Sequence, residues 1–539
     1  MNVTELLSFT PETPGSSKRK QNEDNNTRLH NKKAKMQITD STDPSNLEAE
    51  GEALDDASVK RMIFKFEKKT SRNQELRIKF PDNPEKFVES EVELNEVIQE
   101  MHVLATVPDY YSIMIDLNTI QTLLHLLNHD NTDISIAVVD LLQELTEVDT
   151  LNDNEDAAEG LIDALLEGQI TALLIQNMER LDESVKEEAD GVHNSLGIIE
   201  NVIEFRPESS RDLAAQGLLK WLLQRIKLKA PFDSNKLYAS EILAILLQDN
   251  DNTRSLLGDI DGIDVLLQQL NSYKKRDPDS SEEFECMENL FNSLCSSLMY
   301  TPNKERFMKG EGLQLMNLLL REKKQSRNSA IKVLDYAMTG PEGAELCQKF
   351  VDILGLRTIF PLFMKTPKVN KKGLTGGQLE EHIVSILSSI VKVGSSTQKQ
   401  RVLNKFVEND HEKVERLLEL HFKYLEKVRN CDKQIEREKR SLTADDVTDE
   451  KDDEFYMRRL DAGLFVLQLL DYVMIDISAT GPSTIKSKIM RILNMRGESV
   501  KAVKGVMREY VSNIGETADE KFREKEQNKI LGYLDQFQK

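Results

Sequence analysis

The chain has 539 residues, a formal net charge of -22, and 39% hydrophobic against 30% charged residues. This length is too great for one simple globular core. The negative charge repels a phosphate backbone, so we expect no direct nucleic-acid binding and favour basic protein partners. No apolar run approaches the roughly 20 residues that span a bilayer, because the most hydrophobic run, 464–475, contains Gln468 and Asp471. We therefore expect no membrane association.

Residues 1–55 are rich in Asn, Asp, Ser, Thr and Glu and poor in large apolar residues, which predicts a disordered tail. The tail contains two basic clusters separated by eleven residues, formed by Lys18, Arg19 and Lys20 and by Lys32, Lys33 and Lys35. Two such clusters in an extended segment can occupy two anionic sites on an import receptor at once. We predict a bipartite nuclear localisation signal; the alternative is a basic patch in a solvated tail.

From Asp56 onward, apolar residues recur three and four positions apart, which predicts helices. We expect Ser58 to cap the first helix, whose apolar stripe includes Val59, Ile63 and Phe66. Residues 56–115 are therefore predicted to form a helical cap on the array that follows.

An internal repeat runs through residues 116–432. Its signature is an aliphatic residue, two variable positions and two further aliphatic residues, and each copy opens an amphipathic helix. Six copies, loose in the last two, recur every 43 to 50 residues and begin at Ile120, Ile170, Leu219, Ile263, Leu313 and Leu356. The spacing is close to the ~40–47 residues of armadillo and HEAT repeats.

A glycine precedes five of the copies by one or two residues, at Gly168, Gly217, Gly262, Gly312 and Gly355. We expect these glycines to let one helix end and the next begin at a sharp angle. A polar turn and a longer amphipathic helix follow each copy, so the predicted unit is a short helix, a sharp bend and two antiparallel helices.

Such a small unit cannot bury its apolar stripe alone, so neighbouring units must stack and enclose a long concave surface. We predict an all-α fold, a right-handed superhelical solenoid of armadillo or HEAT type with helical caps at both ends. Residues 433–454 are mostly charged and are expected to form a flexible linker, and 455–539 a C-terminal helical cap.

The sequence contains no Gly-rich phosphate loop, His-Glu-x-x-His helix, cysteine-pair metal signature or nucleophile elbow. His125 and His129 are four residues apart but lack the Glu of a zinc hydrolase. Trp221 follows the repeat register and the four cysteines lie far apart, so we expect core positions and reduced thiols. We therefore predict no catalytic residue, cofactor or metal.

Five segments carry a family resemblance: FPDNPEKF at 80–87, and the segments 130–142, 180–193, 355–365 and 459–468. Through them, and from about Leu54 to the C-terminus, the chain resembles the beta-catenin-like family of armadillo proteins. The resemblance implies a nuclear, spliceosome-associated protein that binds basic segments of its partners. It also implies one partner complex, built around the cell-division-cycle-5-like splicing factor.

Import receptors of the armadillo class line their groove with a Trp and, four residues later, an Asn. Here these positions fall on Asp140 and Glu144, then Gly191 and Ser195, then Glu241 and Ile245. The ladder that clamps an extended peptide backbone is therefore absent. We predict instead an acidic groove whose charge-assisted contacts come from Asp140, Glu144, Glu187, Asp190 and Glu241; the alternative is that some of them face away from it.

Three functions stay open at this point: a splicing-associated scaffold, a nuclear transport adaptor or receptor for basic cargo, and an enzyme with an unrecognised site. We favour the scaffold, located in the nucleus, without a cofactor, and engaged by an import receptor through its tail. The sequence leaves a homodimer open.

Overall fold

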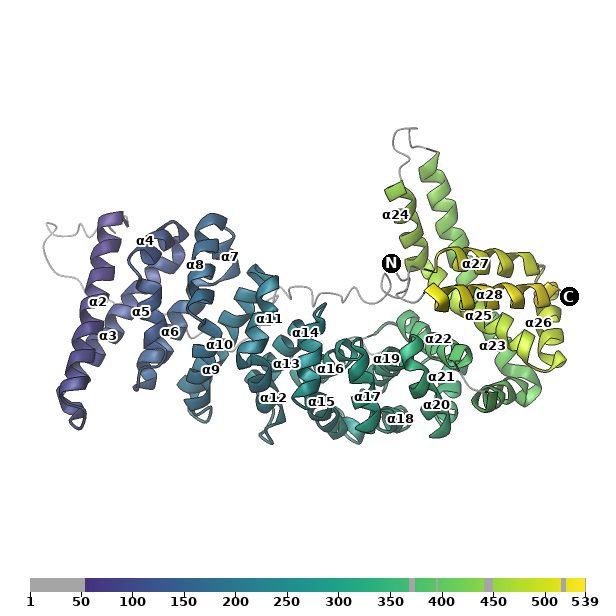
Figure 1. The fold of residues 1–539 in the computed structure, drawn as a ribbon, viewed down its shortest axis with the longest axis horizontal. Coiled ribbons are helices and arrows are strands. Elements are labelled where there is room, and N and C mark those ends of the chain that lie inside the picture. The colour runs from purple at the N-terminus through teal and green to yellow at the C-terminus, as the bar shows by residue number, and fades with distance from the viewer. Residues whose placement is uncertain (1–53, 368–373, 394–395, 441–448, 515–519, 539) are drawn as a thin grey trace, which may run out of the picture.

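Helices stack along one axis, from α2 at one end to the yellow helices of the C-terminal module at the other (Figure 1). The computed structural model describes residues 54–367, 374–393, 396–440, 449–514 and 520–538, and the regular elements in these ranges are all helical. The predicted all-α solenoid is thus confirmed. The tail with both basic clusters lies outside the described residues.

The N-terminal end consists of α2 (Asp56–Lys79) and α3 (Val88–Met101), which pack against each other. A capping box begins α2: the Ser58 N–H donates to the Asp55 carboxylate at 2.8 Å, and the Asp55 N–H donates to the Ser58 hydroxyl at 3.0 Å. The N-cap is therefore Asp55, and our prediction of Ser58 as the cap was wrong, because Ser58 is the third residue of the helix. Because the apolar stripe starts only at Val59, the hydrophobic pattern does not show that the helix begins at Asp56.

Each repeat contains three helices, and the aliphatic signature opens the second one in every copy, as predicted. These second helices are α5 (Thr119–Leu126), α9 (Ile170–Arg180), α12 (Leu219–Lys227), α15 (Gly262–Asn271), α18 (Gly312–Glu322) and α21 (Leu356–Met364). The short first helices are α4 (Tyr111–Asp116), α8 (Glu155–Glu167), α11 (Ser210–Leu213), α14 (Asp251–Asp259), α17 (Thr301–Lys309) and α20 (Ala344–Asp352). Because α4 packs on α5 and α8, the first repeat begins near Tyr111 and not at residue 116.

The third helices lie side by side along the array, each contacting the next. They are α6 (Thr132–Leu145), α10 (Lys186–Phe205), α13 (Ser234–Leu246), α16 (Ser281–Ser297), α19 (Arg327–Met338) and α22 (Gly376–Val393). We call the surface that they share with α3 the third-helix face. Short elements complete the array: α7 (Val148–Leu151), the 3₁₀ turns η1 (Pro84–Lys86), η2 (His102–Thr106), η3 (Pro108–Tyr110), η4 (Pro207–Ser209), η6 (Ser272–Lys274) and η7 (Pro341–Gly343), and the π turn η5 (Ala214–Leu218).

Most of the glycines before the signature do not provide the unusual backbone conformation that we expected at the bend. Only Gly217 has a positive φ, of 109°, whereas at other junctions the left-handed residue is a neighbour such as Gln169, Asp261 or Glu311. The remaining glycines are needed for packing, because an added Cβ would meet the side chain of an adjacent helix. At Gly312 that Cβ would lie 2.2 Å from Phe307 Cε2.

The C-terminal module begins with α23 (Ser396–Lys439), whose backbone turns at 408–411 and then continues to Lys439. It is followed by α24 (Asp449–Arg459), the π turn η9 (Leu460–Leu464), α25 (Phe465–Thr480), α26 (Ser483–Met495), α27 (Val500–Ser512) and α28 (Glu520–Gln538). The second part of α23 and α24 form a hairpin that projects from the array (Figure 1).

The flexible linker predicted over 433–454 is wrong at both of its ends. Residues up to Lys439 belong to α23 and residues from Asp449 to α24, while 441–448 lie outside the described residues. Ion pairs between the two helices explain the difference: Lys439 binds Asp452 at 2.6 Å and Arg458 binds Glu438 at 2.6 Å. The high charge of this segment therefore stabilises a helical hairpin.

Helix α25 is the core of the C-terminal module and contacts α22, α23, α26, α27 and α28. The continuous helical stretch Lys451–Thr480 is long and apolar enough to cross a membrane by composition, but 83% of its most apolar window is buried inside the protein, as in a core helix. Gln468 and Asp471, which interrupt the apolar run, are fully buried.

Trp221 is buried, as predicted, and so are Cys286, Cys295 and Cys347. All four cysteines are free thiols, and Cys431 alone among them is partly exposed. Burial raises the pKa of the Cys286 thiol to about 11, so it stays protonated at neutral pH.

Candidate functional site

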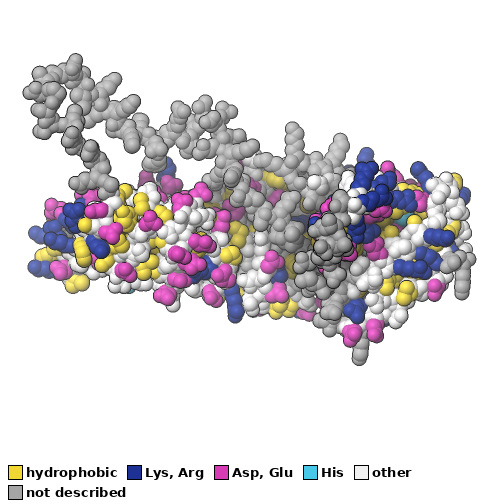
Figure 2. Space-filling model, turned by 90° about the horizontal axis from the view of Figure 1, so that it is seen from above, with side chains coloured by type: hydrophobic (Ala, Val, Ile, Leu, Met, Phe, Trp, Pro, Cys, Tyr) yellow, Lys and Arg dark blue, Asp and Glu magenta, His cyan; other side chains and the backbone are white. Residues whose placement is uncertain are grey.

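Acidic residues are concentrated in the first two repeats. Residues 116–200 contain twenty Asp or Glu and only Arg180 and Lys186 as cations, so this segment accounts for most of the net charge of -22. The view in Figure 2 shows a dark-blue group at the N-terminal end, magenta side chains spread over the N-terminal half beyond it, and further dark-blue side chains toward the C-terminal part. The uneven distribution of charge along the chain is visible in the sequence, but our prediction used the total charge alone.

Asp140 is the centre of the candidate site on the third-helix face. It is half-buried on α6, and the Asn194 amide of α10 donates a 2.8 Å hydrogen bond to its Oδ1. Burial raises the pKa of Asp140, and the negative charges of Glu144 and Asp190 add to the rise, whereas Asn194 and His102 oppose it. Three of the five predicted groove residues therefore lie together where α6 meets α10.

Glu144 lies one turn beyond Asp140 on α6 and is exposed. Its Oε2 is 2.7 Å from Nδ1 of His102 in η2, whose other ring nitrogen is buried without a hydrogen-bond partner in the described part of the chain. Among the described residues, no Lys or Arg pairs with Asp140, Glu144 or Asp190. The cluster is thus a concentration of negative charge, two of whose carboxylates contact the Asn194 amide and the His102 ring.

The other two predicted residues are not part of this cluster. Glu187 is exposed in the first turn of α10, and Glu241 lies on α13, near Cys286 of α16. The import-receptor positions of the second repeat, Gly191 and Ser195, are buried, and a Cβ at Gly191 would lie 2.9 Å from Ile136 Cγ1 of α6. The side chains of α10 at the site are therefore Asp190 and Asn194, one residue away from the assumed register.

Polar contacts between neighbouring third helices continue beyond this cluster. Tyr238 donates to Glu200 at 2.5 Å, Ser329 donates to Glu288 at 2.6 Å, and His382 Nδ1 lies 2.8 Å from Asp335. Burial raises the pKa of Glu288, and it also raises that of Glu381 beside His382. These carboxylates contact side chains of neighbouring helices and stabilise the stacking of the repeats. They are therefore less available to a binding partner than Glu144 and Asp190.

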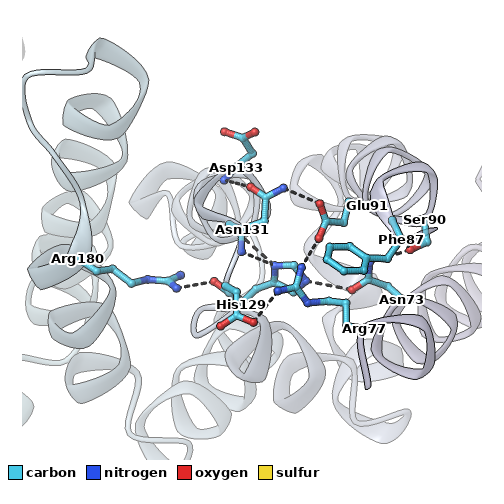
Figure 3. Close-up of polar contacts among 10 residues, drawn as sticks. Asn73, Arg77, Phe87, Ser90, Glu91, His129, Asn131, Asp133 and Arg180 are labelled. Atoms are coloured by element: carbon cyan, nitrogen blue, oxygen red, sulfur yellow. Dashed lines mark hydrogen bonds and ion pairs between the residues drawn. The ribbon is translucent and has the colours of Figure 1, made fainter. Parts of the chain in front are cut away.

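A second polar network joins the N-terminal cap to the repeats (Figure 3). The His129 ring accepts from the Asn131 N–H at 3.1 Å through Nδ1 and donates to Asn73 at 3.0 Å through Nε2. Arg77 binds Glu91 and also Asp130, and Arg180 of α9 donates to the Leu127 carbonyl at 3.0 Å. Burial, together with Arg77, lowers the pKa of His129, so the ring is neutral and structural.

An open pocket of about 470 Å³ lies at the base of the α23–α24 hairpin, lined by Lys427, Asn430, Cys431, Gln434, Arg458 and Asp461. Arg458 is already paired with Glu438. In the described part of the chain, no group of three His, Cys, Asp or Glu side chains is placed to hold a metal ion. We find no arrangement of nucleophile, base and oxyanion donors in this pocket.

Comparison with known proteins finds relatives that match most of the chain. The chain is 61% identical over 487 residues to beta-catenin-like protein 1 of Homo sapiens, covering 90% of this chain and 86% of that protein. It is 32% identical to the Schizosaccharomyces pombe homologue, with 90% and 84% covered. Computationally designed armadillo repeat proteins for modular peptide recognition match 51% of this chain and 98% of theirs, with 14% identity and a TM-score of 0.36. Residues 36–508 match the family model described as catenin-beta-like, Arm-motif containing nuclear, and the chain therefore belongs to this family.

Proposed function

We propose that the protein is a non-catalytic nuclear scaffold for pre-mRNA splicing, which holds basic segments of splicing factors on the third-helix face where α6 meets α10. The observation that carries this proposal is the meeting of Asp140, Glu144 and Asp190 with no pairing Lys or Arg among the residues that the structure describes. The family to which the chain belongs is described as nuclear, which supports the location. The basic clusters of the tail are proposed to bring the chain there through an import receptor.

A cation docked at this site would relieve the repulsion among the three carboxylates. Charge-assisted hydrogen bonds from Lys or Arg to carboxylates are stronger than neutral ones, and Asp140 is half-buried, where such contacts are screened less by solvent. The negative field of the first two repeats would also speed the encounter with a basic segment. The site thus fits a Lys/Arg-rich peptide segment better than an acidic or apolar one.

A role as transport receptor is the second candidate. It is supported by the same acidic face, but the buried Gly191 and Ser195 leave no room for the Trp and Asn that clamp a peptide backbone in import receptors. Recognition here would rest on side-chain charge. Such binding suits an assembly factor with defined partners and does not by itself supply a release mechanism.

Affinity purification from nuclear extract tests the proposal. The tagged full chain should retain splicing factors with and without ribonuclease, and Asp140→Lys/Glu144→Lys should lose most of them, because two carboxylates at the site become cations. Glu155→Lys/Glu159→Lys is the matched control, since it reverses two exposed charges at the same spacing on α8, a first helix. Equal retention by both variants, or absence of splicing factors from the unmodified chain, would refute the proposal.

A further inference from the structure

The surface of α26 and α27 has the opposite charge to the acidic first two repeats. Residues 483–512 contain seven Lys or Arg and two Glu. Both acids are neutralised by the hairpin and η9 region: Glu498 binds Arg429 at 2.5 Å, and Glu509 binds Arg459. Lys488 is buried and paired with Glu415 at 2.7 Å. The exposed charged side chains of this segment, Arg491, Arg496, Lys501 and Arg508, are therefore all cations.

The exposed residues of the two helices form stripes without an acidic side chain. On α27 the stripe contains Lys501, Gly505, Arg508 and Ser512, and on α26 it contains Ser487, Arg491 and Asn494. Among the described residues, Arg491, Lys501 and Arg508 have no hydrogen-bond or ion-pair partner. An added Cβ at Gly505 would meet nothing within 4 Å, so the helix backbone is open to a close neighbour between Lys501 and Arg508.

The total charge of -22 does not govern this surface. At physiological salt, charges are screened over about 8 Å, and packed helices lie about 8–10 Å apart. The acidic helices α6 and α10 are separated from α27 by α13, α16, α19, α22 and α25 along the array, so a ligand at α27 lies several screening lengths from them. The expectation of no nucleic-acid binding therefore applies to the acidic repeats and does not extend to this end.

We propose that the exposed face of α26 and α27 binds the phosphate backbone of single-stranded nucleic acid. Lys501 and Arg508 are seven residues apart, about 10 Å along the helix, and can contact separate phosphates of one strand. Met495, 71% exposed beside Arg496, offers a polarizable side chain against which a base can pack. An acidic peptide could pair with the same cations, but it lacks a planar base to pack against Met495, and the test below includes it as the alternative.

Binding of a fluorescein-labelled 20-nucleotide oligouridine RNA to the full chain, followed by fluorescence anisotropy, tests this proposal. Lys501→Glu/Arg508→Glu should weaken binding about tenfold or more and flatten the dependence of log Kd on log salt by about 1.4, because two phosphate contacts are lost. The control, Lys60→Glu/Lys68→Glu, makes the same change in charge at exposed positions of α2 and should bind like the unmodified chain.

Three results would overturn the proposal: unchanged RNA affinity in the α27 variant, an equal loss in the α2 control, or tighter binding of a polyglutamate peptide of the same charge than of the RNA. Circular dichroism of each variant verifies that the helices are intact. Because this face is separate from the Asp140 cluster, the Asp140→Lys/Glu144→Lys variant should retain RNA binding, whether or not the proposed scaffold function holds.

Discussion

Replacing Asp471 by alanine should lower the free energy of unfolding by about 3–5 kcal/mol, the usual cost of removing one member of a buried ion pair. Its Oδ1 lies 2.5 Å from Nδ1 of His421, and both side chains are at most 1% exposed. Burial alone would lower the pKa of His421, but the charge and hydrogen bond of Asp471 outweigh it and raise the pKa. Without Asp471, the imidazole must either lose its proton or remain buried as an unpaired cation. Urea unfolding followed by circular dichroism measures the loss.

The double variant His421→Leu/Asp471→Ala separates the ion pair from simple packing. Removing both charged groups should recover most of the stability lost in the single variant, because no unpaired charge remains in the core. If the losses of the single variants His421→Leu and Asp471→Ala simply added in the double variant, the two residues would not be coupled as an ion pair. A cost of less than about 1 kcal/mol for Asp471→Ala would also contradict this role for the pair.

Gly312→Ala should also destabilise the protein, by about 1–3 kcal/mol, because overpacking forces neighbouring side chains to move. The new Cβ would lie 2.2 Å from Phe307 Cε2, and Phe307 is fully buried between α17 and α18. The control is Gly532→Ala in α28, where a Cβ meets nothing within 4 Å. There the better helix propensity of alanine should leave stability unchanged or raise it by up to about 1 kcal/mol.

The companion change Glu311→Gly distinguishes packing from backbone conformation at this junction. Glu311 has φ of 62°, so glycine there should be tolerated without the loss expected at position 312. A neutral Gly312→Ala together with a destabilising Glu311→Gly, measured by the same urea unfolding, would contradict our interpretation of the junction.

The repeats could be predicted from the sequence because each aliphatic signature is a local pattern, and all six open a helix. The role of the glycines could not, since the steric contact between Gly312 and Phe307 depends on the angle between two helices. Residues 433–439 also misled us. A run of charges indicates a solvated linker unless its partners are known, and the ion pairs to α24 come from residues beyond it in the chain.

The candidate site was partly predictable because two of its residues belong to one local helical pattern. Asp140 and Glu144 are four residues apart, and helical periodicity places them on one face of α6. Whether Asp190 or Gly191 points toward them depends on the rotation of α10, which the sequence pattern did not fix to within one residue. Asn194, whose amide binds Asp140, carried no signal that a single sequence could reveal.

The most direct test of the central claim is a charge-swap binding measurement at Asp140 and Glu144. We predict that a peptide of alternating Lys and Arg binds the full chain and binds the Asp140→Lys/Glu144→Lys variant at least tenfold more weakly. A peptide with every cation replaced by Glu should show the reverse preference, because its charge then matches the altered site. Equal affinity of the basic peptide for both chains at low salt would contradict the claim that this acidic cluster binds basic segments.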